Sequence, residues 1–257
     1  VVAIAGLEEG VITPSTVIYG AGQFTEITPS PTCWIFNQYG GHHGNETVVT
    51  AIRDSCNYFF YEVGYRLAGG RSLGGYNVEQ GLATLEKYAR MFGLGDKSGL
   101  EIAEYDPQIS DEDAVRSSIG QGTNAFSLSH IGRYVAALAN RGSVYNLTLL
   151  DRVESADGTL IEENEADLYN QVEIADSSWD AVQQGMMLVA DDTTSLNALS
   201  DLGLDVAGKT GTAQQSRSHP NHALFVGYAP ADNPEIAVAV RIANGYTSSN
   251  TAEVAAD

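Results

Sequence analysis

The chain has 257 residues, of which 13 are Lys or Arg and 33 are Asp or Glu, so its formal net charge is −20. A field of this sign repels phosphate backbones and anionic lipids, so we expect no nucleic-acid partner and no binding to a membrane surface. Hydrophobic residues make up 43% of the chain and charged residues 18%, which is typical of a folded globular protein rather than of a disordered acidic tail. Uninterrupted apolar runs such as 1–5 and 236–240 are far shorter than the roughly 20 residues of a transmembrane helix.

Helical patterns dominate the first 140 residues. Residues 1–10 are apolar up to a Gly stop and have no N-terminal cap, so we expect the rear part of a helix. Residues 11–46 are rich in Gly, Pro and Thr and lack a clear period, which predicts a long surface connection. Apolar residues then recur every three or four positions in four segments, at 47–53, 57–68, 78–92 and 127–140. The sequence therefore predicts a helical block.

The pattern changes after residue 146. Two short runs, 147–153 and 159–161, flank Asp157-Gly158 and predict a β-hairpin, and residues 178–190 are again helical. Strand patterns follow at 206–212, 222–228 and 236–242, separated by turn-rich segments. Because these connections are short enough for hairpins and too short for a crossover helix, we expect three antiparallel strands.

The expected fold class is mixed α/β, of the α+β kind, with a helical block packed on an antiparallel sheet. We expect a single domain over residues 1–257, with a helical subdomain up to about residue 205 that carries the hairpin near 147–161, and a sheet-forming part over about 206–257. A capping pattern, Asn-Thr-Ala-Glu at 250–253, opens one more helix near the end of the chain. We therefore expect both ends of the chain to lie inside elements.

Residues 203–210, Gly-Leu-Asp-Val-Ala-Gly-Lys-Thr, match the nucleotide-binding pattern G-x-x-x-x-G-K-T. A phosphate-binding loop of that kind needs a buried strand before its first Gly and a helix after its Lys. Residues 195–202 are instead helix-like, and residues 214–220 have no helical pattern. No apolar strand here ends in an Asp that could hold Mg²⁺. We therefore interpret this segment as a turn that leads into a strand.

Other short motifs favour structural interpretations. Residues 70–74, Gly-Arg-Ser-Leu-Gly, match the nucleophile elbow G-x-S-x-G, but they join two predicted helices, so a catalytic Ser72 is not expected. The His42-His43 pair has no nearby Cys or acidic cluster with zinc spacing and is interpreted as solvated loop. Cys33 and Cys56 are interpreted as buried or idle thiols, with a disulfide between them as the disfavoured alternative. The sequence predicts neither a metal nor a cofactor.

Two further motifs fit a shared site. Ser55-Cys56-Asn57 lies between two predicted helices, where an i, i+2 pair in extended backbone presents a hydroxyl and an amide to the same side. The alternative is that Asn57 only caps the next helix. Residues 209–212, Lys-Thr-Gly-Thr, place a cation, two hydroxyls and a side-chain-free Gly along a strand edge where an extended peptide could bind. Each motif alone is weak evidence for a functional site.

Taken together, the motifs resemble those of the transpeptidase domain of penicillin-binding proteins, in particular the monofunctional class B group. The likeness extends over nearly the whole chain. It is carried by Ser55-Cys56-Asn57 and by segments 5–10, 33–34, 43–44, 118–122, 208–214 and 223–230. The resemblance implies the fold shared by serine β-lactamases and these transpeptidases, incomplete in this chain.

One departure from the family concerns its nucleophile, which belongs to a Ser-x-x-Lys motif. No Lys of this chain has a Ser three positions before it; the lysines are Lys87, Lys97 and Lys209. The family places that motif a few residues before the helix at 5–10. The resemblance therefore implies that the nucleophile lies upstream of residue 1, and that this chain alone is inactive.

The resemblance also implies a reaction. The family forms an acyl-enzyme from peptidoglycan stem peptides ending in D-Ala-D-Ala, passes the acyl group to an amine of a neighbouring stem, and is a target of β-lactam antibiotics. Carried over, Ser55 relays a proton to the leaving amine and Asn57 hydrogen-bonds the donor peptide. Lys209 keeps Ser55 in position and supplies positive potential.

The strand motif has implied roles in substrate binding. Thr210 and Thr212, with Gly211 between them, bind the terminal carboxylate. The Thr212 N–H supplies half of the oxyanion hole, and the other half belongs to the absent serine.

Partners and location are implied by the same resemblance. Cell-wall or division proteins are expected partners, and the domain is expected on the outer face of the bacterial cytoplasmic membrane, with its anchor outside these 257 residues. A β-lactamase, a D,D-carboxypeptidase or a β-lactam sensor shares the site and remains an alternative. A non-catalytic cell-wall scaffold is an alternative of another class.

Overall fold

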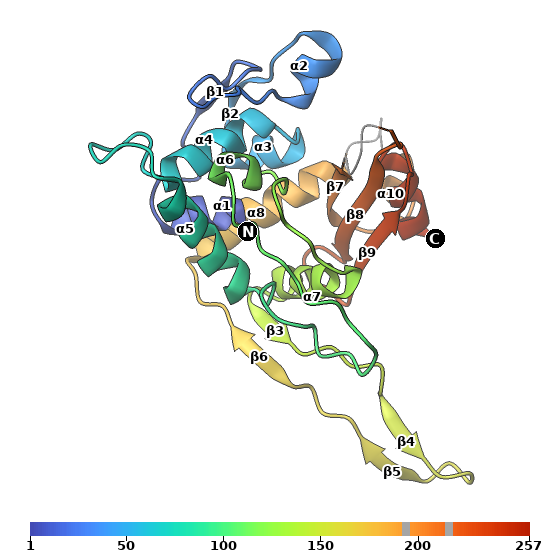
Figure 1. Cartoon of the computed structure of the whole chain (residues 1–257). Coiled ribbons are helices and arrows are strands. Elements are labelled where there is room, and N and C mark those ends of the chain that lie inside the picture. The colour runs from blue at the N-terminus through green and yellow to red at the C-terminus, as the bar shows by residue number, and fades with distance from the viewer. Residues whose placement is uncertain (192–195, 214–217) are drawn as a thin grey trace.

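The computed structural model of the chain describes residues 1–191, 196–213 and 218–257. Up to residue 139 the elements are α1 (Val2–Glu8), β1 (Ile18–Gly20), α2 (Trp34–Tyr39), β2 (Gly44–Glu46), α3 (Val48–Arg53), α4 (Asn57–Leu67), α5 (Val78–Met91), α6 (Ala114–Ser117) and α7 (Leu128–Ala139). The later elements are β3 (Ser143–Tyr145), β4 (Arg152–Glu154), β5 (Leu160–Glu163), β6 (Leu168–Gln171), α8 (Asp176–Ala190), α9 (Asn197–Ser200), β7 (Ala207–Ala213), β8 (His222–Ala229), β9 (Ile236–Ile242) and α10 (Ser249–Ala256). Figure 1 shows a body that contains the helices and strands β7, β8 and β9, from which β4 and β5 project.

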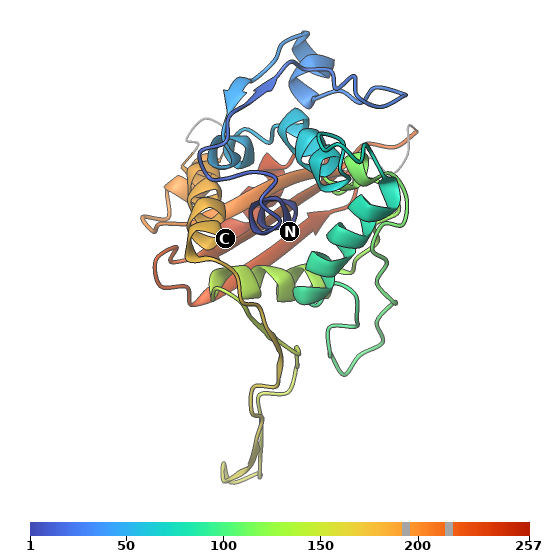
Figure 2. The same cartoon turned by 90° about the vertical axis from the view of Figure 1, so that its left-hand side faces the viewer.

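The sheet near the C-terminus has the order β7-β8-β9 and is antiparallel throughout. Lys209 lies opposite Val226, and Val226 lies opposite Ala239. Helix α8 packs against β7 and α7 against β9, while α10 contacts β8 and β9. In Figure 2, α1, α7 and α8 lie in front of the sheet. The three predicted antiparallel strands are confirmed to within one residue, and so is the combination of a helical block with this sheet.

The predicted helices are also present. Those expected up to residue 140 correspond to α1, α3, α4, α5 and α7, the later one corresponds to α8, and the one near the C-terminus corresponds to α10. The predicted cap at Asn250 is wrong, because the N-cap of α10 is Ser248 and Asn250 is already helical. In the described part of the chain, no helix is both long enough and apolar enough to cross a bilayer. The division of one domain into a helical part up to about residue 205 and a sheet-forming part stays a prediction.

Helix α8 is the central support of the core. Its residues Trp179, Val182 and Met186 recur at helical spacing and are all buried. Helix α3 approaches α8 so closely that an added Cβ on Gly185 would lie 2.8 Å from the Ile52 Cβ. Since α8 contacts β7 as well as α3, it places the chain just after α3 near the edge of the sheet.

Residues 11–46 form more than the predicted surface connection. Strands β1 and β2 pair antiparallel, with Ile18 opposite Glu46, and α2 lies between them in the sequence. In Figure 1 this layer lies over α3 and α4. The prediction of a surface connection was wrong because each strand has only three residues and pairs with a strand distant in sequence. Neither strand therefore produces a local period that the sequence could reveal.

The predicted hairpin is the tip of a longer projection formed by β3 to β6, residues 143–171, which we call the arm. Strand β4 pairs with β5 around the predicted turn, and β3 pairs with β6 closer to the body. Residues 147–151, predicted as strand, precede β4 without belonging to it. Here the Leu149 N–H donates to a Glu101 carboxylate oxygen at 2.9 Å, and the Thr148 hydroxyl donates to the same carboxylate. A side chain from a distant loop therefore replaces a strand partner.

Two interior helical glycines allow a matched test of this packing. A Cβ at Gly64 in α4 would lie 2.0 Å from Ser118 Oγ and 2.9 Å from the Ala114 carbonyl oxygen, whereas a Cβ at Gly132 in α7 would meet nothing within 4 Å. We expect Gly64→Ala to lower the free energy of unfolding by about 1–3 kcal/mol through overpacking. Gly132→Ala should raise it by about 0.5–1 kcal/mol, because Ala loses less backbone entropy than Gly in a helix. Urea unfolding followed by circular dichroism measures both, and shifts of the same sign would contradict the packing of α4 against α6.

Candidate active site

Ser55 lies in the tight turn between α3 and α4. Its φ of +50° is left-handed, a conformation that costs a non-glycine residue roughly 1–2 kcal/mol. Two hydrogen bonds hold the turn: the Cys56 N–H donates to the Ala51 carbonyl at 2.9 Å, and the Trp34 indole N–H donates to the Asp54 carbonyl at 3.1 Å. A strained backbone conformation that is stabilised by surrounding hydrogen bonds is typical of functional positions.

Asn57 is the first residue of α4, and Cys56 holds the N-cap position. The predicted extended i, i+2 arrangement is therefore wrong, because Ser55 is left-handed and Asn57 is already helical. The alternative in which Asn57 caps the helix is wrong as well. Both Ser55 and Asn57 nevertheless line the same cleft, since the sharp turn redirects the chain between them.

Lys209 reaches Ser55 from the middle of β7. Its ammonium group donates a hydrogen bond to Ser55 Oγ and another, of 3.1 Å, to the Thr210 carbonyl oxygen. Among the described residues Lys209 forms no salt bridge, and burial lowers its pKa to about 8. The predicted meeting of two motifs 154 residues apart is confirmed.

The two motifs line one cleft with a volume of about 1850 Å³. The predicted site residues on its wall are Ser55, Asn57, Lys209, Thr210, Gly211 and Thr212. Within the described ranges β7 pairs only with β8. The other edge of β7 therefore keeps backbone N–H and C=O groups that an extended ligand could pair with.

Aromatic and amide side chains complete the wall of the cleft. Trp34, Tyr39 and Gln121 line it, and the Trp34 and Tyr39 rings meet edge to face at 6.5 Å. The sequence reasoning did not assign these three residues to the site. For Trp34 and Gln121 the available signal was that segments 33–34 and 118–122 belong to the motifs that carry the family resemblance. Tyr39 lies outside those segments and had no such signal.

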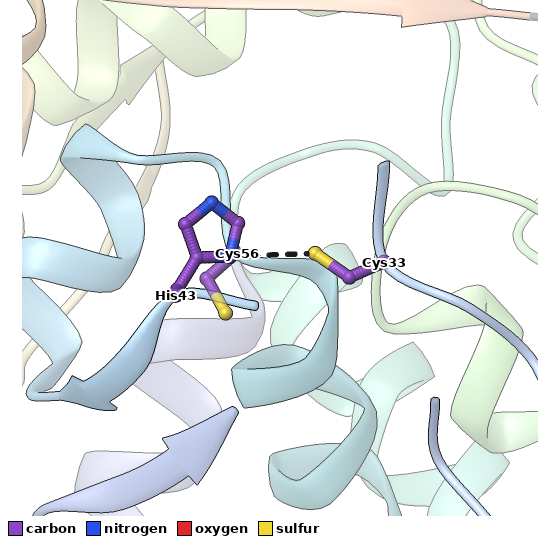
Figure 3. A group of neighbouring side chains, drawn as sticks. All are labelled: Cys33, His43 and Cys56. Atoms are coloured by element: carbon purple, nitrogen blue, oxygen red, sulfur yellow. Dashed lines mark hydrogen bonds between the residues drawn. The ribbon is translucent and has the colours of Figure 1, made fainter. Parts of the chain in front are cut away.

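A cluster of possible metal ligands, shown in Figure 3, lies next to the Ser55 turn, because one of its members is Cys56. Cys33, His43 and Cys56 place one ligand atom each within 4.8 Å of one another, and His43 Nδ1 lies 3.5 Å from Cys33 Sγ. Two thiol sulfurs and an imidazole nitrogen are a donor set that suits Zn²⁺. In the described part of the chain, these are the residues that could hold a metal ion.

The chemistry of this cluster corrects one interpretation from the sequence. His43 is not a solvated loop residue, because its Nε2 is buried and has no partner among the described groups. Both cysteines are buried free thiols. A hydrogen bond from Cys56 lowers the pKa of the Cys33 thiol to about 5, and the same interaction, together with burial, raises the pKa of Cys56. The spacing of the three residues matches no metal motif, so only the fold reveals the cluster.

Two competing motifs have structural roles. Lys209 and Thr210 lie inside β7 rather than at the start of a helix, so the backbone geometry of a phosphate-binding loop is absent there. Of the helical segment predicted at 195–202, before Lys209, the structure shows α9. Residue 195 and residues 214–217, which also counted against a phosphate-binding loop, lie outside the described ranges. Ser72 lies between α4 and α5, and its hydroxyl donates to the Gly69 carbonyl at 2.7 Å.

Comparison with known proteins adds a second line of support. The family model for the penicillin binding protein transpeptidase domain matches residues 1–257. The chain is 29% identical to the peptidoglycan D,D-transpeptidase MrdA of Haemophilus influenzae, over 99% of this chain and 42% of that protein. It is 26% identical to penicillin-binding protein 2B of Streptococcus pneumoniae, over 92% of this chain and 38% of that protein. The chain thus spans less than half the length of these relatives.

Solved structures show the same fold. PBP2 of Pseudomonas aeruginosa, solved in complex with WCK 5153, matches with a TM-score of 0.80 and 28% identity, over 99% of this chain and 55% of that chain. Penicillin-binding protein 2B of Streptococcus pneumoniae R6 matches with a TM-score of 0.83 and 24% identity, over 99% of this chain and 45% of that chain.

The left-handed turn at Ser55 predicts an unusual order of stability for two variants. Ser55→Ala and Ser55→Gly both lose the hydroxyl that Lys209 contacts, but only Gly adopts a φ of +50° without a steric cost. We expect Ser55→Gly to be more stable than Ser55→Ala by about 1 kcal/mol, as measured by urea unfolding. An Ala variant as stable as the Gly variant would show that the turn is not strained.

Proposed function

The chain belongs to the penicillin-binding protein transpeptidase family, and from this premise we propose that it forms the acyl-transfer core of a class B peptidoglycan D,D-transpeptidase. The contact between Ser55 and Lys209, which joins the two motifs in one cleft, carries the proposal. The nucleophilic serine is not among these 257 residues, because no Ser-x-x-Lys is present. We place it in a part of the protein outside this sequence, so the chain alone forms no acyl-enzyme.

In the proposed reaction, the nucleophilic serine attacks the carbonyl carbon of the penultimate D-alanine of a stem peptide. An ester bond forms, the peptide bond to the last D-alanine breaks, and the leaving amine takes up a proton. Ser55 relays that proton, because its hydroxyl can accept one proton while it donates another. Lys209 has a pKa lowered to about 8, so it can exchange a proton with Ser55 near neutral pH. An amine of a second stem then attacks the ester and regenerates the serine.

The proposed substrate lies along β7. An extended stem peptide pairs with the free edge of residues 209–212, where Gly211 presents no side chain against it. Thr210 and Thr212 hydrogen-bond the terminal carboxylate, and Asn57 on the opposite wall bonds the donor amide. The Thr212 N–H serves as one oxyanion donor, a contribution worth roughly 3–4 kcal/mol in known acyl transfer.

We also propose an extracytoplasmic location on the bacterial cytoplasmic membrane, cell-wall or division proteins as partners, and β-lactam antibiotics as ligands of the same cleft. A solved complex of penicillin-binding protein PBP2 with MreC from Helicobacter pylori, similar to this chain in fold, provides an example of such a partner for that protein. The remaining alternatives differ in the fate of the acyl-enzyme. Rapid hydrolysis of a β-lactam adduct would favour a β-lactamase, and transfer to water from a stem peptide would favour a carboxypeptidase.

Labelling with a fluorescent penicillin tests the proposal. We expect no covalent adduct on the 257-residue chain, and a stable adduct on the longer natural protein, at the serine of an upstream Ser-x-x-Lys. Lys87→Ala should leave the labelling of the longer protein unchanged, because Lys87 pairs with Glu9 away from the cleft.

Two outcomes would contradict the proposal. An adduct on the short chain, mapped by mass spectrometry to Ser55 or Ser72, would show that the nucleophile has been misplaced. A natural gene without an upstream Ser-x-x-Lys, together with an unlabelled full-length protein, would favour the non-catalytic scaffold.

A further inference from the structure

The arm has a tip that nothing else in the described structure covers. Strands β4 and β5, joined by a turn at 155–159, pair only with each other. Figures 1 and 2 both show this tip projecting away from the helices and the sheet. The outer edge of β5 therefore presents unpaired backbone donors and acceptors, which is a template for another strand.

The tip exposes apolar side chains instead of burying them. All four residues of β5 are exposed, including Leu160 at 51% and Ile161 at 65%. Leu149 and Leu150 nearby are also exposed. An isolated two-stranded hairpin is only marginally stable in water, because it has no third element to cover its apolar side chains. Such a hairpin gains stability from an added strand.

The charge of the arm restricts what that strand can be. Between residues 146 and 171 there are seven acidic residues and one basic residue, Arg152. Arg152 is already paired with Glu154 at 2.8 Å. Glu162 and Glu163 of β5 form no ion pair with any described residue. A second copy of the arm would place like charges opposite each other, and nucleic acid or anionic lipid would be repelled.

The order of residues along β5 specifies a pattern. Leu160 lies opposite Glu154 and Glu162 opposite Val153, so the register shifts at Ile161 and β5 does not alternate strictly between its faces. Along the strand, two adjacent apolar residues are followed by two adjacent acidic residues. A complementary antiparallel strand needs two adjacent basic residues followed by two adjacent apolar residues, so that each residue lies opposite its counterpart.

We propose that the arm is a docking element that binds an extended basic segment of a partner protein as an additional strand on the free edge of β5. The segment has a Lys-Lys-Val-Ile type of pattern: its basic pair lies against Glu162 and Glu163, and its apolar pair covers Leu160 and Ile161. This site lies outside the acyl-transfer cleft, because none of these four residues lines it.

Fluorescence anisotropy with synthetic peptides on the 257-residue chain tests this docking. The probe is a labelled Thr-Lys-Lys-Val-Ile-Thr peptide, and the control is Thr-Lys-Val-Lys-Ile-Thr, which has the same composition and charge but places Val opposite Glu162 and Lys opposite Ile161. We expect the probe to bind at least tenfold more tightly than the control. The double variant Glu162→Lys/Glu163→Lys should lose that binding and gain affinity for Thr-Glu-Glu-Val-Ile-Thr.

A matched variant separates docking from general attraction to an acidic protein. Asp232→Lys/Glu235→Lys makes the same change of charge at two exposed positions in the turn before β9, and it should leave probe binding within twofold. A second variant, in which an Asn-Gly turn replaces residues 151–164, should not bind the probe. The helices and the sheet of the body should keep their circular dichroism signal in this variant.

Four results would each overturn the proposal: equal binding of probe and control peptides, equal losses in the two charge variants, binding that survives removal of the tip, or an arm-dependent dimer in sedimentation.

Discussion

The hydrogen bond from the Lys209 ammonium to the Ser55 hydroxyl is the interaction on which the proposed site depends. A buried ammonium group loses hydration and needs partners to offset that loss. The described structure gives Lys209 a hydroxyl and a carbonyl oxygen but no carboxylate, and its pKa is lowered to about 8. The cleft therefore holds a cation without its own counter-ion, which suits a substrate that brings a carboxylate and a reaction in which a proton moves through Ser55.

Helix α8 gives this contact its geometry. It packs closely on α3 through Gly185 and Ile52, and it also contacts β7. The turn after α3 carries Ser55 and β7 carries Lys209, so one helix sets the distance between them. On the other side, Trp34 holds the Asp54 carbonyl, and the cluster of Cys33, His43 and Cys56 lies next to the turn. Contacts on both sides thus fix the Ser55 turn. Such contacts are needed because a non-glycine residue keeps a left-handed conformation only when its surroundings stabilise it.

The features that the sequence could predict are those with a local period or a specific motif. Amphipathic helices such as α5 and α7, and the strands of the sheet, are within reach because their periods are 3.6 and 2. The pairing of β1 with β2, the metal-ligand cluster and the Glu101 contact of the arm each join segments without a shared local signal, and they were missed. The shared site of Ser55 and Lys209 was predicted only because the two motifs together resemble a family. The left-handed φ of Ser55 had no counterpart in composition or spacing.

The most direct test of the account is a double-mutant cycle on the longer protein that carries the Ser-x-x-Lys motif, with the rate of acylation by benzylpenicillin as the readout. The three variants are Ser55→Ala, Lys209→Met and the double variant. If Ser55 and Lys209 act as one unit, each single change lowers the rate by roughly 10²-fold or more, and the double change lowers it little further. Multiplicative losses in the double variant, or a rate unchanged by Lys209→Met, would contradict a shared acyl-transfer site.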